Sequence, residues 1–263
     1  MNSPAEIARL YVDSGTQKSM LPPSKMFVMG ILAGMFIAMG GFASSVASYG
    51  ISEPGLARLL SAAVFPVGLM LVLVAGAELF TGNNLMIMPV MQKRITVPAM
   101  LKNWGIVYCG NFIGSVFIAW IVTASTGSAL YDGALMQTMA ATALAKVNMG
   151  FVDAIMRGIM CNLMVCLAVW VSIAAADLAG KIMALYLPVF LFVLCGFEHC
   201  IANMYFIPAG IFAGWMGKMT PEGLNWLTFA YRNLIPVTIG NVIGGSVLTG
   251  GAYWFVYLQG HAE

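Results

Sequence analysis

The sequence predicts an all-α membrane protein whose six transmembrane helices form two inverted three-helix repeats. Hydrophobic residues make up 60% of the 263 residues and charged residues only 8%, whereas a soluble domain carries about 25% charged residues. Six apolar segments reach the length of about 20 residues that crosses a bilayer core. In addition, one pattern of glycine, glutamate and asparagine occurs once in each half of the chain.

The six apolar segments fall into two sets of three. They cover residues 26–50, 59–90, 100–126, 151–176, 183–216 and 229–258. The first set gives repeat one, residues 26–127, and the second gives repeat two, residues 151–258, of a single transmembrane channel domain, 26–258. Because each repeat has an odd number of spans, the second is expected to cross the membrane in the opposite sense.

The second and fifth segments are too long for one simple span. They hold the repeated pattern as Gly76-x-Glu78-x-x-x-x-Asn83 and Gly196-x-Glu198-x-x-x-x-Asn203. Glycine and asparagine are poor helix formers, so we expect both helices to be unwound at their centres. Non-helical backbone at that depth is tolerated only where it lines a cavity or is buried in protein. The two breaks therefore predict a pore at the repeat interface.

The third and sixth segments carry a second repeated block. Gly110-Asn111-Phe112-Ile113-Gly114 recurs as Gly240-Asn241-Val242-Ile243-Gly244. Small residues let the backbones of neighbouring helices approach closely in a membrane. We expect both blocks, including their asparagines, to serve helix packing.

The ends of the chain are polar. Residues 1–25 predict a cytoplasmic tail with a short amphipathic helix over 7–12, and residues 259–263 predict a second cytoplasmic tail. With the N-terminus inside, seven basic residues face the cytoplasm and five face outward, a mild positive-inside bias. The inner set is Arg9, Lys18, Lys25, Lys93, Arg94, Lys102 and Lys181. The outer set, which we expect in outer loops, is Arg58, Lys146, Arg157, Lys218 and Arg232.

His199 is the main candidate for chemistry. Ionisable residues inside a span are rare and face the protein interior or water, so a role in the pore is favoured over simple packing. An imidazole can donate a hydrogen bond to an anion or pass it a proton. The other histidine, His261, lies in the terminal tail and is expected to be idle. Two histidines and no CxxC motif predict no metal site, no cofactor and no enzyme.

Four residues of the repeated pattern are expected to brace the breaks. Glu78, Asn83, Glu198 and Asn203 are equivalent in pairs, and a carboxylate in the pore would repel an anion. Thr81 differs, because its equivalent is Ile201. Its hydroxyl is therefore free to bind a small polar solute opposite His199. Asn162 is a further amide that needs a partner in an apolar span.

Two further groups of residues have two interpretations each. Apolar side chains beside the breaks either pack or form constrictions that exclude water: Phe65, Leu69, Leu79, Phe80 and Phe192. Lys18 and Lys146 lie just outside apolar segments. They either extend to the interface as membrane lysines do or concentrate small anions at the mouths of a pore.

Taken together, the motifs resemble those of the formate/nitrite transporter family over residues 15–257. They are Gly76-Ala-Glu-Leu-Phe-Thr-Gly-Asn83, Asn103-Trp-x6-Gly-Asn-Phe-Ile-Gly114, Gly196-Phe-Glu-His-Cys-Ile-Ala-Asn-Met204 and Asn233-Leu-Ile-Pro-Val-Thr-Ile-Gly-Asn-Val-Ile-Gly244. The resemblance implies a homopentamer of aquaporin-like protomers in a prokaryotic plasma (inner) membrane. It also implies one pore per protomer and a central lipid-filled hole that carries no substrate.

The resemblance also implies roles for single residues. His199 would face Thr81 between two hydrophobic slits, with Asn162 contacting the chamber between them. The cytoplasmic slit would consist of Leu69, Leu79 and Phe80, and the outer slit of Phe65 and Phe192. Lys18 and Lys146 would be the lysines of the two vestibules.

Formate is the favoured substrate of this predicted anion channel. The segment Tyr205-Phe-Ile-Pro-Ala-Gly-Ile211 resembles the formate-type and hydrosulfide branches of the family more than the nitrite branch. Hydrosulfide and nitrite remain alternatives, and a neutral small-solute facilitator is a more distant one. Protons are a possible second partner, so channel and proton symport both stay open. A net charge of +2 does not suggest a nucleic-acid partner.

Overall fold

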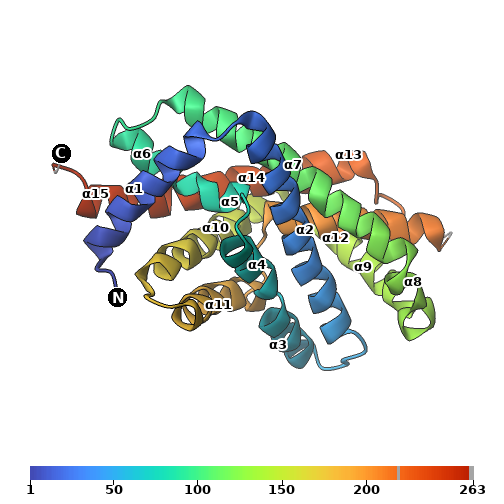
Figure 1. The fold of residues 1–263 in the computed structure, drawn as a ribbon. Helices are drawn as coiled ribbons and strands as arrows, with labels where there is room; N and C mark the ends of the chain where they lie inside the picture. The colour runs from blue at the N-terminus through green and yellow to red at the C-terminus, as the bar shows by residue number, and fades with distance from the viewer. Residues whose placement is uncertain (218–219, 261–263) are drawn as a thin grey trace.

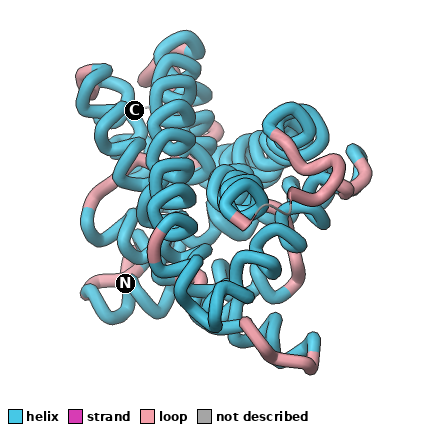
Figure 2. The backbone as a smooth tube through the Cα atoms, turned by 90° about the vertical axis from the view of Figure 1, so that its right-hand side faces the viewer, coloured by secondary structure: helices cyan, strands magenta, loops and turns pink. Residues whose placement is uncertain are grey.

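The computed structural model describes residues 1–217 and 220–260, and all regular structure in these ranges is helical (Figure 1). Figure 2 shows the same helices joined mostly by short loops. The first part of the chain contains, in order, α1 (Pro4–Met20), α2 (Pro23–Ser48), α3 (Pro54–Val64), α4 (Val67–Ala75), α5 (Phe80–Asn83), the 3-10 turn η1 (Asn84–Met86), α6 (Ile87–Met91) and α7 (Val97–Ala124).

The second part of the chain follows a similar order. It contains α8 (Thr126–Ala129), the turn η2 (Leu130–Gly133), α9 (Ala134–Val147), α10 (Phe151–Ala174), α11 (Leu178–Leu194), α12 (Cys200–Met216), α13 (Trp226–Thr228), α14 (Ile235–Val242) and α15 (Ala252–Tyr257). The π-helical stretch η3 (Phe229–Leu234) joins α13 to α14, and a second, η4 (Ile243–Gly251), joins α14 to α15. His261 and Lys218 lie outside the described residues.

Within the described residues, five helical stretches are long and apolar enough to cross a membrane. They are Pro23–Ser48, Pro54–Ala75, Val97–Val147, Phe151–Ala174 and Trp226–Tyr257. The stretch Val97–Val147 is not one rod, because Tyr131 and Asp132 have positive φ and reverse the chain between α7 and α9. The fifth segment of the sequence prediction is divided into two 17-residue helices, α11 and α12.

The N-terminal helix is longer than the sequence suggested. We expected a helix over residues 7–12, whereas α1 covers 17 residues. It begins with a capping box, in which the Ser3 and Glu6 side chains satisfy each other's backbone N–H groups. Its buried face, which includes Ile7 and Tyr11, packs on α6, α10 and α15. The Tyr11 hydroxyl donates to the Gly82 carbonyl at 3.1 Å, so α1 is packed against the segment that follows the first break.

Residues 134–147 are a second correction. We expected Lys146 to lie in an outer loop, but it stands in the last turn of α9, which packs along α12. The segment is too short to span a bilayer, which is why it was interpreted as a loop. Its buried Leu135, Met139, Ala143 and Val147 recur every four residues, and that spacing is the signal of an amphipathic helix.

Two helix pairs are packed at the closest distance that backbones allow. The pair α2 and α7 meets through Gly30, Gly34, Gly110 and Gly114. The pair α10 and α14 meets through Gly158 and Gly240, and Gly244 in η4 continues the contact with α10. At Gly114 a methyl group would collide with the Ile31 carbonyl, and at Gly244 with the Ile159 carbonyl. The packing role predicted for the two repeated glycine blocks is confirmed.

Gly114→Ala is expected to lower the stability of the protein by roughly 2 kcal/mol, since an overpacked methyl group costs about 1–3 kcal/mol. Gly105→Ala on the same helix is the matched control, because a Cβ there meets nothing within 4 Å. Alanine favours a helix interior over glycine, so the control should be neutral or stabilising. Thermal unfolding in detergent measures both, and an unchanged melting temperature for Gly114→Ala would contradict this account.

Candidate functional site

The polypeptide leaves helical geometry at two equivalent places. The first break covers residues 76–79, between α4 and α5, and the second covers residues 195–199, between α11 and α12. Gly76 and Gly196 have φ values of 81° and 71°, a region that is strained for residues with a Cβ. Both breaks occur where the repeated pattern predicted them.

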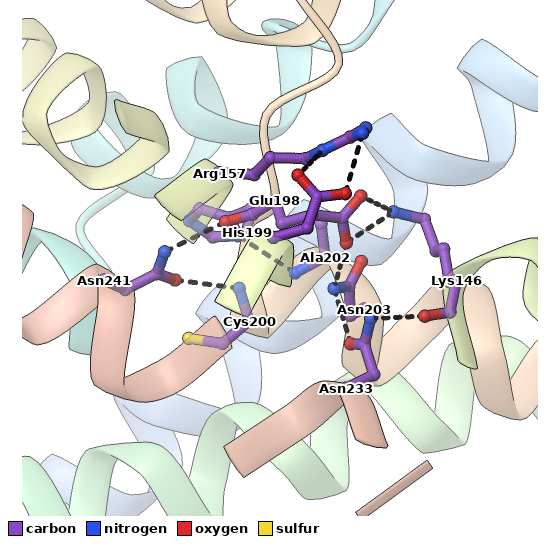
Figure 3. A network of polar contacts seen from close by, with 10 residues as sticks. Lys146, Arg157, Glu198, His199, Cys200, Ala202, Asn203, Asn233 and Asn241 are labelled. Carbon is purple, nitrogen blue, oxygen red and sulfur yellow. Dashed lines mark hydrogen bonds and ion pairs between the residues drawn. The ribbon is translucent and has the colours of Figure 1, made fainter. Parts of the chain in front are cut away.

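One asparagine holds each break from a neighbouring helix. The Asn111 side chain donates to the Gly30 and Glu78 carbonyls at 2.8 and 2.9 Å and accepts from the Phe80 N–H at 2.9 Å. Asn241 makes the same three bonds to Gly158, Glu198 and Cys200, the last two of which are drawn in Figure 3. These asparagines therefore satisfy backbone groups that would otherwise be unpaired. The sequence prediction had given them only a packing role.

A charged cluster lies beside each break. In the first, Lys18 Nζ lies 2.9 Å from Glu78 Oε1 and donates to Asn83 Oδ1 at 2.9 Å. Asn83 Nδ2 in turn donates to Glu78 Oε2 at 2.7 Å and to Asn103 Oδ1 at 2.9 Å. Asn103 closes the ring by donating to the Lys18 carbonyl at 3.5 Å.

The second cluster repeats the first (Figure 3). Lys146 Nζ donates to both carboxylate oxygens of Glu198, at 2.8 and 2.9 Å. Asn203 Nδ2 donates to Glu198 Oε2 and to Asn233 Oδ1, both at 2.7 Å, and Asn233 donates to the Lys146 carbonyl at 3.0 Å. Lys18 and Lys146 are thus neutralised by buried glutamates, which neither interpretation of the sequence had included.

The duplicated contacts reach beyond the three helices assigned to each repeat. Lys18 and Lys146 stand in α1 and α9, which precede α2 and α10. The N–H groups of Glu78 and Glu198 donate to the carbonyls of Met29 and Arg157, at 3.2 and 3.3 Å. Lys146 follows Lys18 in the sequence by the same number of residues as Arg157 follows Met29. The duplicated contacts therefore include the helix that precedes α2 and the helix that precedes α10.

Between the two breaks, Thr81 faces His199. Thr81 Oγ1 lies 3.0 Å from His199 Nε2, and both side chains are buried. The Ala202 N–H donates to His199 Nδ1 at 3.0 Å, so Nδ1 carries no proton and a neutral ring has its proton on Nε2. Nε2 then donates to Thr81 Oγ1, and the hydroxyl proton of Thr81 is left to donate to a third group.

Asn162 acts on the backbone of Thr81. Its Nδ2 lies 3.2 Å from the Thr81 carbonyl, 2.8 Å from Asn84 Oδ1 and 2.7 Å from the Asn241 carbonyl. Because the carbonyls of Thr81 and Asn241 can only accept, the nitrogen of the Asn162 amide must face them, which fixes the orientation of the amide. Asn162 Oδ1 and Asn84 Nδ2 have no partner among the described residues. Asn84, which the sequence interpretation did not select, belongs to this cluster.

The centre of the site is nearly closed. Four of the five apolar candidates, Phe65, Leu69, Leu79 and Phe192, line one cavity of about 10 Å³ together with His199. The Phe65 and Phe192 rings meet edge to face with centroids 5.7 Å apart. Phe80 is not among the lining residues, and its ring packs on Trp104 and Tyr108. A slit role for Phe80 stays a prediction.

A larger cavity of about 740 Å³ reaches this closed centre from one side. We call it the vestibule. Its lining includes Phe65, Phe192 and His199 at the inner end and Lys146 and Glu198 on its wall. The inner end of the vestibule therefore adjoins the paired phenylalanines and His199, and Thr81 is not among the lining residues of either cavity. Within residues 1–217 and 220–260, no cluster of three or more metal-ligating side chains is found.

Comparison with known proteins gives consistent matches over nearly the whole chain. The family model described as "Formate/nitrite transporter" matches residues 5–255. A probable formate transporter of Methanothermobacter thermautotrophicus is 40% identical, over 98% of this chain and 97% of that protein. The formate channel FocA of Escherichia coli (strain K12) is 39% identical, over 97% and 94%.

Two solved structures share the fold. A pentameric formate channel with formate bound has a TM-score of 0.80 and 35% sequence identity, over 90% of this chain and 98% of that chain. An FNT family ion channel has a TM-score of 0.85 and 26% identity, over 95% and 98%.

Glu198→Gln is expected to lower the free energy of unfolding by about 3 kcal/mol, because it leaves the Lys146 charge without its counter-ion. Breaking a buried ion pair costs about 3–5 kcal/mol, and the lower end applies since the Lys146 side chain is 18% exposed. Asp153→Asn is the control: it breaks the exposed Asp153–Arg157 pair, which is worth about 0.5 kcal/mol or less. Equal losses of stability in denaturation experiments would contradict the bracing role of Glu198.

Proposed function

Because the chain belongs to the formate/nitrite transporter family, we propose that it carries formate across a membrane. The observation that supports this most directly is the buried Thr81–His199 pair, 3.0 Å apart, whose imidazole lines an apolar constriction. A monocarboxylate in this position accepts a hydrogen bond from the Thr81 hydroxyl, whose oxygen in turn accepts from His199 Nε2. The relatives that are named as formate channels and formate transporters support the choice of substrate.

The constriction favours a small solute that crosses in neutral form. An isolated carboxylate is costly in an apolar environment without compensating partners. Formate therefore passes Phe65 and Phe192 as formic acid, or is protonated beside them. The Ala202 N–H keeps Nδ1 of His199 unprotonated, so the proposal assigns His199 the role of hydrogen-bond donor. The proton then comes from a hydronium ion in the solution that fills the vestibule, which becomes a water molecule.

We extend the proposal to the architecture of the protein. The duplicated bonds of Asn111 and Asn241, and of Glu78 and Glu198, support two inverted repeats of α2–α7 and α10–α15. The helices α1 and α15 contact each other on one side of the molecule in Figure 1, which supports placing both ends of the chain in the cytoplasm. The proposed location is a prokaryotic inner membrane, with residues 26–258 as one channel domain.

The proposed assembly is a homopentamer with one pore per protomer and lipid in the central hole. Its support is the resemblance to a solved structure described as pentameric. Large exposed apolar side chains on α7 and α11 supply surfaces that neighbouring protomers or lipid would cover. They include Phe117, Trp120, Leu187 and Leu191.

The experiment that tests the function is uptake into liposomes containing the purified protein, with formate, nitrite, hydrosulfide and urea compared over a range of pH. Formate uptake that rises as the external solution is acidified is the expected result. Faster nitrite or hydrosulfide uptake would assign the pore to one of those anions. Transport of urea without a response to pH would identify a neutral-solute facilitator.

His199→Phe is expected to reduce formate uptake to the background of empty liposomes, because it removes the polar group opposite Thr81. Thr81→Ala should also reduce uptake strongly, while Thr81→Ser, which keeps the hydroxyl, should retain most of it. Melting temperatures serve as the control for folding. Normal uptake by a folded His199→Phe variant would remove this residue from the mechanism.

Phe192→Ala is expected to widen the constriction, because the Phe192 ring packs on both Phe65 and His199. Acetate uptake relative to formate should rise several-fold. Phe190→Ala provides a control on the same helix, since Phe190 packs on Tyr186 and does not line the small cavity. Unchanged selectivity in Phe192→Ala would show that the ring only fills space.

A further inference from the structure

Among the residues that the structure describes, the vestibule wall carries one cation without an acidic partner. Five charged residues line the cavity: Arg58, Lys146, Asp153, Arg157 and Glu198. Lys146 pairs with Glu198 at 2.8 Å (Figure 3), and Arg157 pairs with Asp153 at 2.9 Å. Arg58 has no ion pair or hydrogen bond within the part of the chain that the structure describes. The excess positive charge of the vestibule therefore rests on Arg58.

Lys146 is poorly suited to capture an anion. Its ammonium group already donates to both oxygens of the Glu198 carboxylate. An anion that approaches this point meets a neutral pair whose negative member is equally close. After both pairs are formed, the remaining electrostatic attraction on an anion is directed toward Arg58.

Arg58 stands on a face of α3 that leads to the constriction. Arg58, Ser61 and Phe65 are three and four residues apart, and all line the vestibule. At 1.5 Å of rise per residue, Ser61 lies about 4.5 Å along the helix from Arg58, and Phe65 about 6 Å further. Phe65 also lines the small cavity with His199. The same helix face thus presents a cation, a hydroxyl and the closing aromatic ring in succession.

The second break sets the place of the guanidinium group. Gly196 has a positive φ, and a Cβ at this position would collide with Nη1 of Arg58. The Arg58 side chain is therefore packed against the backbone of the second break, two residues before Glu198. Ser61 has a hydroxyl that makes no hydrogen bond within the described ranges. Both groups keep their donors for a solute.

We propose that Arg58 and Ser61 form a carboxylate-binding subsite in the vestibule, where a small monocarboxylate is held before it passes Phe65 and Phe192. This rests on the proposed transport function and extends it to a second binding position. The guanidinium offers two parallel N–H groups that match the two oxygens of a carboxylate. The Ser61 hydroxyl donates a third bond on the side that faces the constriction.

Equilibrium binding of ¹³C-formate to the purified protein in detergent tests the subsite, with line broadening as the measurement. Arg58→Gln should weaken binding about tenfold. Arg58→Lys keeps the charge but loses the paired donors, so it should weaken binding about threefold, and the loss should persist in 0.5 M salt. Lys181→Gln, which removes a charge from α11 outside the vestibule lining, should bind like the wild type.

Formate uptake by the same variants supplies the second measurement. Arg58→Gln should raise the half-saturating concentration about tenfold while the maximal rate stays within twofold, and Ser61→Ala should raise it about threefold. Equal binding by Arg58→Gln and the wild type would overturn the subsite. Equal binding by Arg58→Lys and the wild type would also overturn it, because only a diffuse field would remain.

The two measurements separate this subsite from the transport function. If the wild type binds formate through Arg58 but carries none into liposomes, the proposed transport of formate fails and the subsite stands. If the wild type carries formate and the Arg58 variants match it in both assays, the subsite fails and the transport function stands.

Discussion

The structure depends on the need to satisfy backbone groups at the two breaks inside an apolar protein. Residues 76–79 and 195–199 leave the helical ladder, and unpaired N–H and C=O groups at that depth are costly. Asn111 and Asn241 supply the missing bonds from helices packed against α2 and α10. Each asparagine can reach its break only because neighbouring glycines bring the helix backbones together. The glycines and the asparagines thus act together to satisfy the backbone groups at each break.

The buried carboxylates follow from the same constraint. Glu78 and Glu198 extend from the breaks into apolar surroundings and each is paired with a lysine and an asparagine. The lysines come from α1 and α9, so these two helices are needed to neutralise the breaks. The bracing contacts are therefore the same at both breaks. Thr81 and His199, whose equivalents in the other repeat are apolar, lie between them. Rigid, repeated bracing allows a few unmatched polar groups to be held at defined positions.

Much of this could be predicted from the sequence. The helical class, the transporter family and the glycines at which the helices break were confirmed, because hydropathy and Gly-x-Glu spacing are local signals. The family also agrees with the expectation of transport rather than enzymatic function. The helix α9 was interpreted as a loop because 14 residues fall short of a span. The pairing of Lys146 with Glu198, the participation of Asn84 and the position of Arg58 depend on tertiary contacts that no local pattern encodes.

The small size of the cavity beside His199 has a consequence for the energetics of the cell. About 10 Å³ holds at most one water molecule, so the resting protein contains no continuous file of water through this point. Protons that hop along hydrogen-bonded water would find the chain interrupted at Phe65 and Phe192. Each proton that leaked inward would dissipate about 2.3 kcal/mol per 100 mV of membrane potential. A closed apolar contact of two aromatic rings thus lets a membrane hold many copies of the protein without discharging.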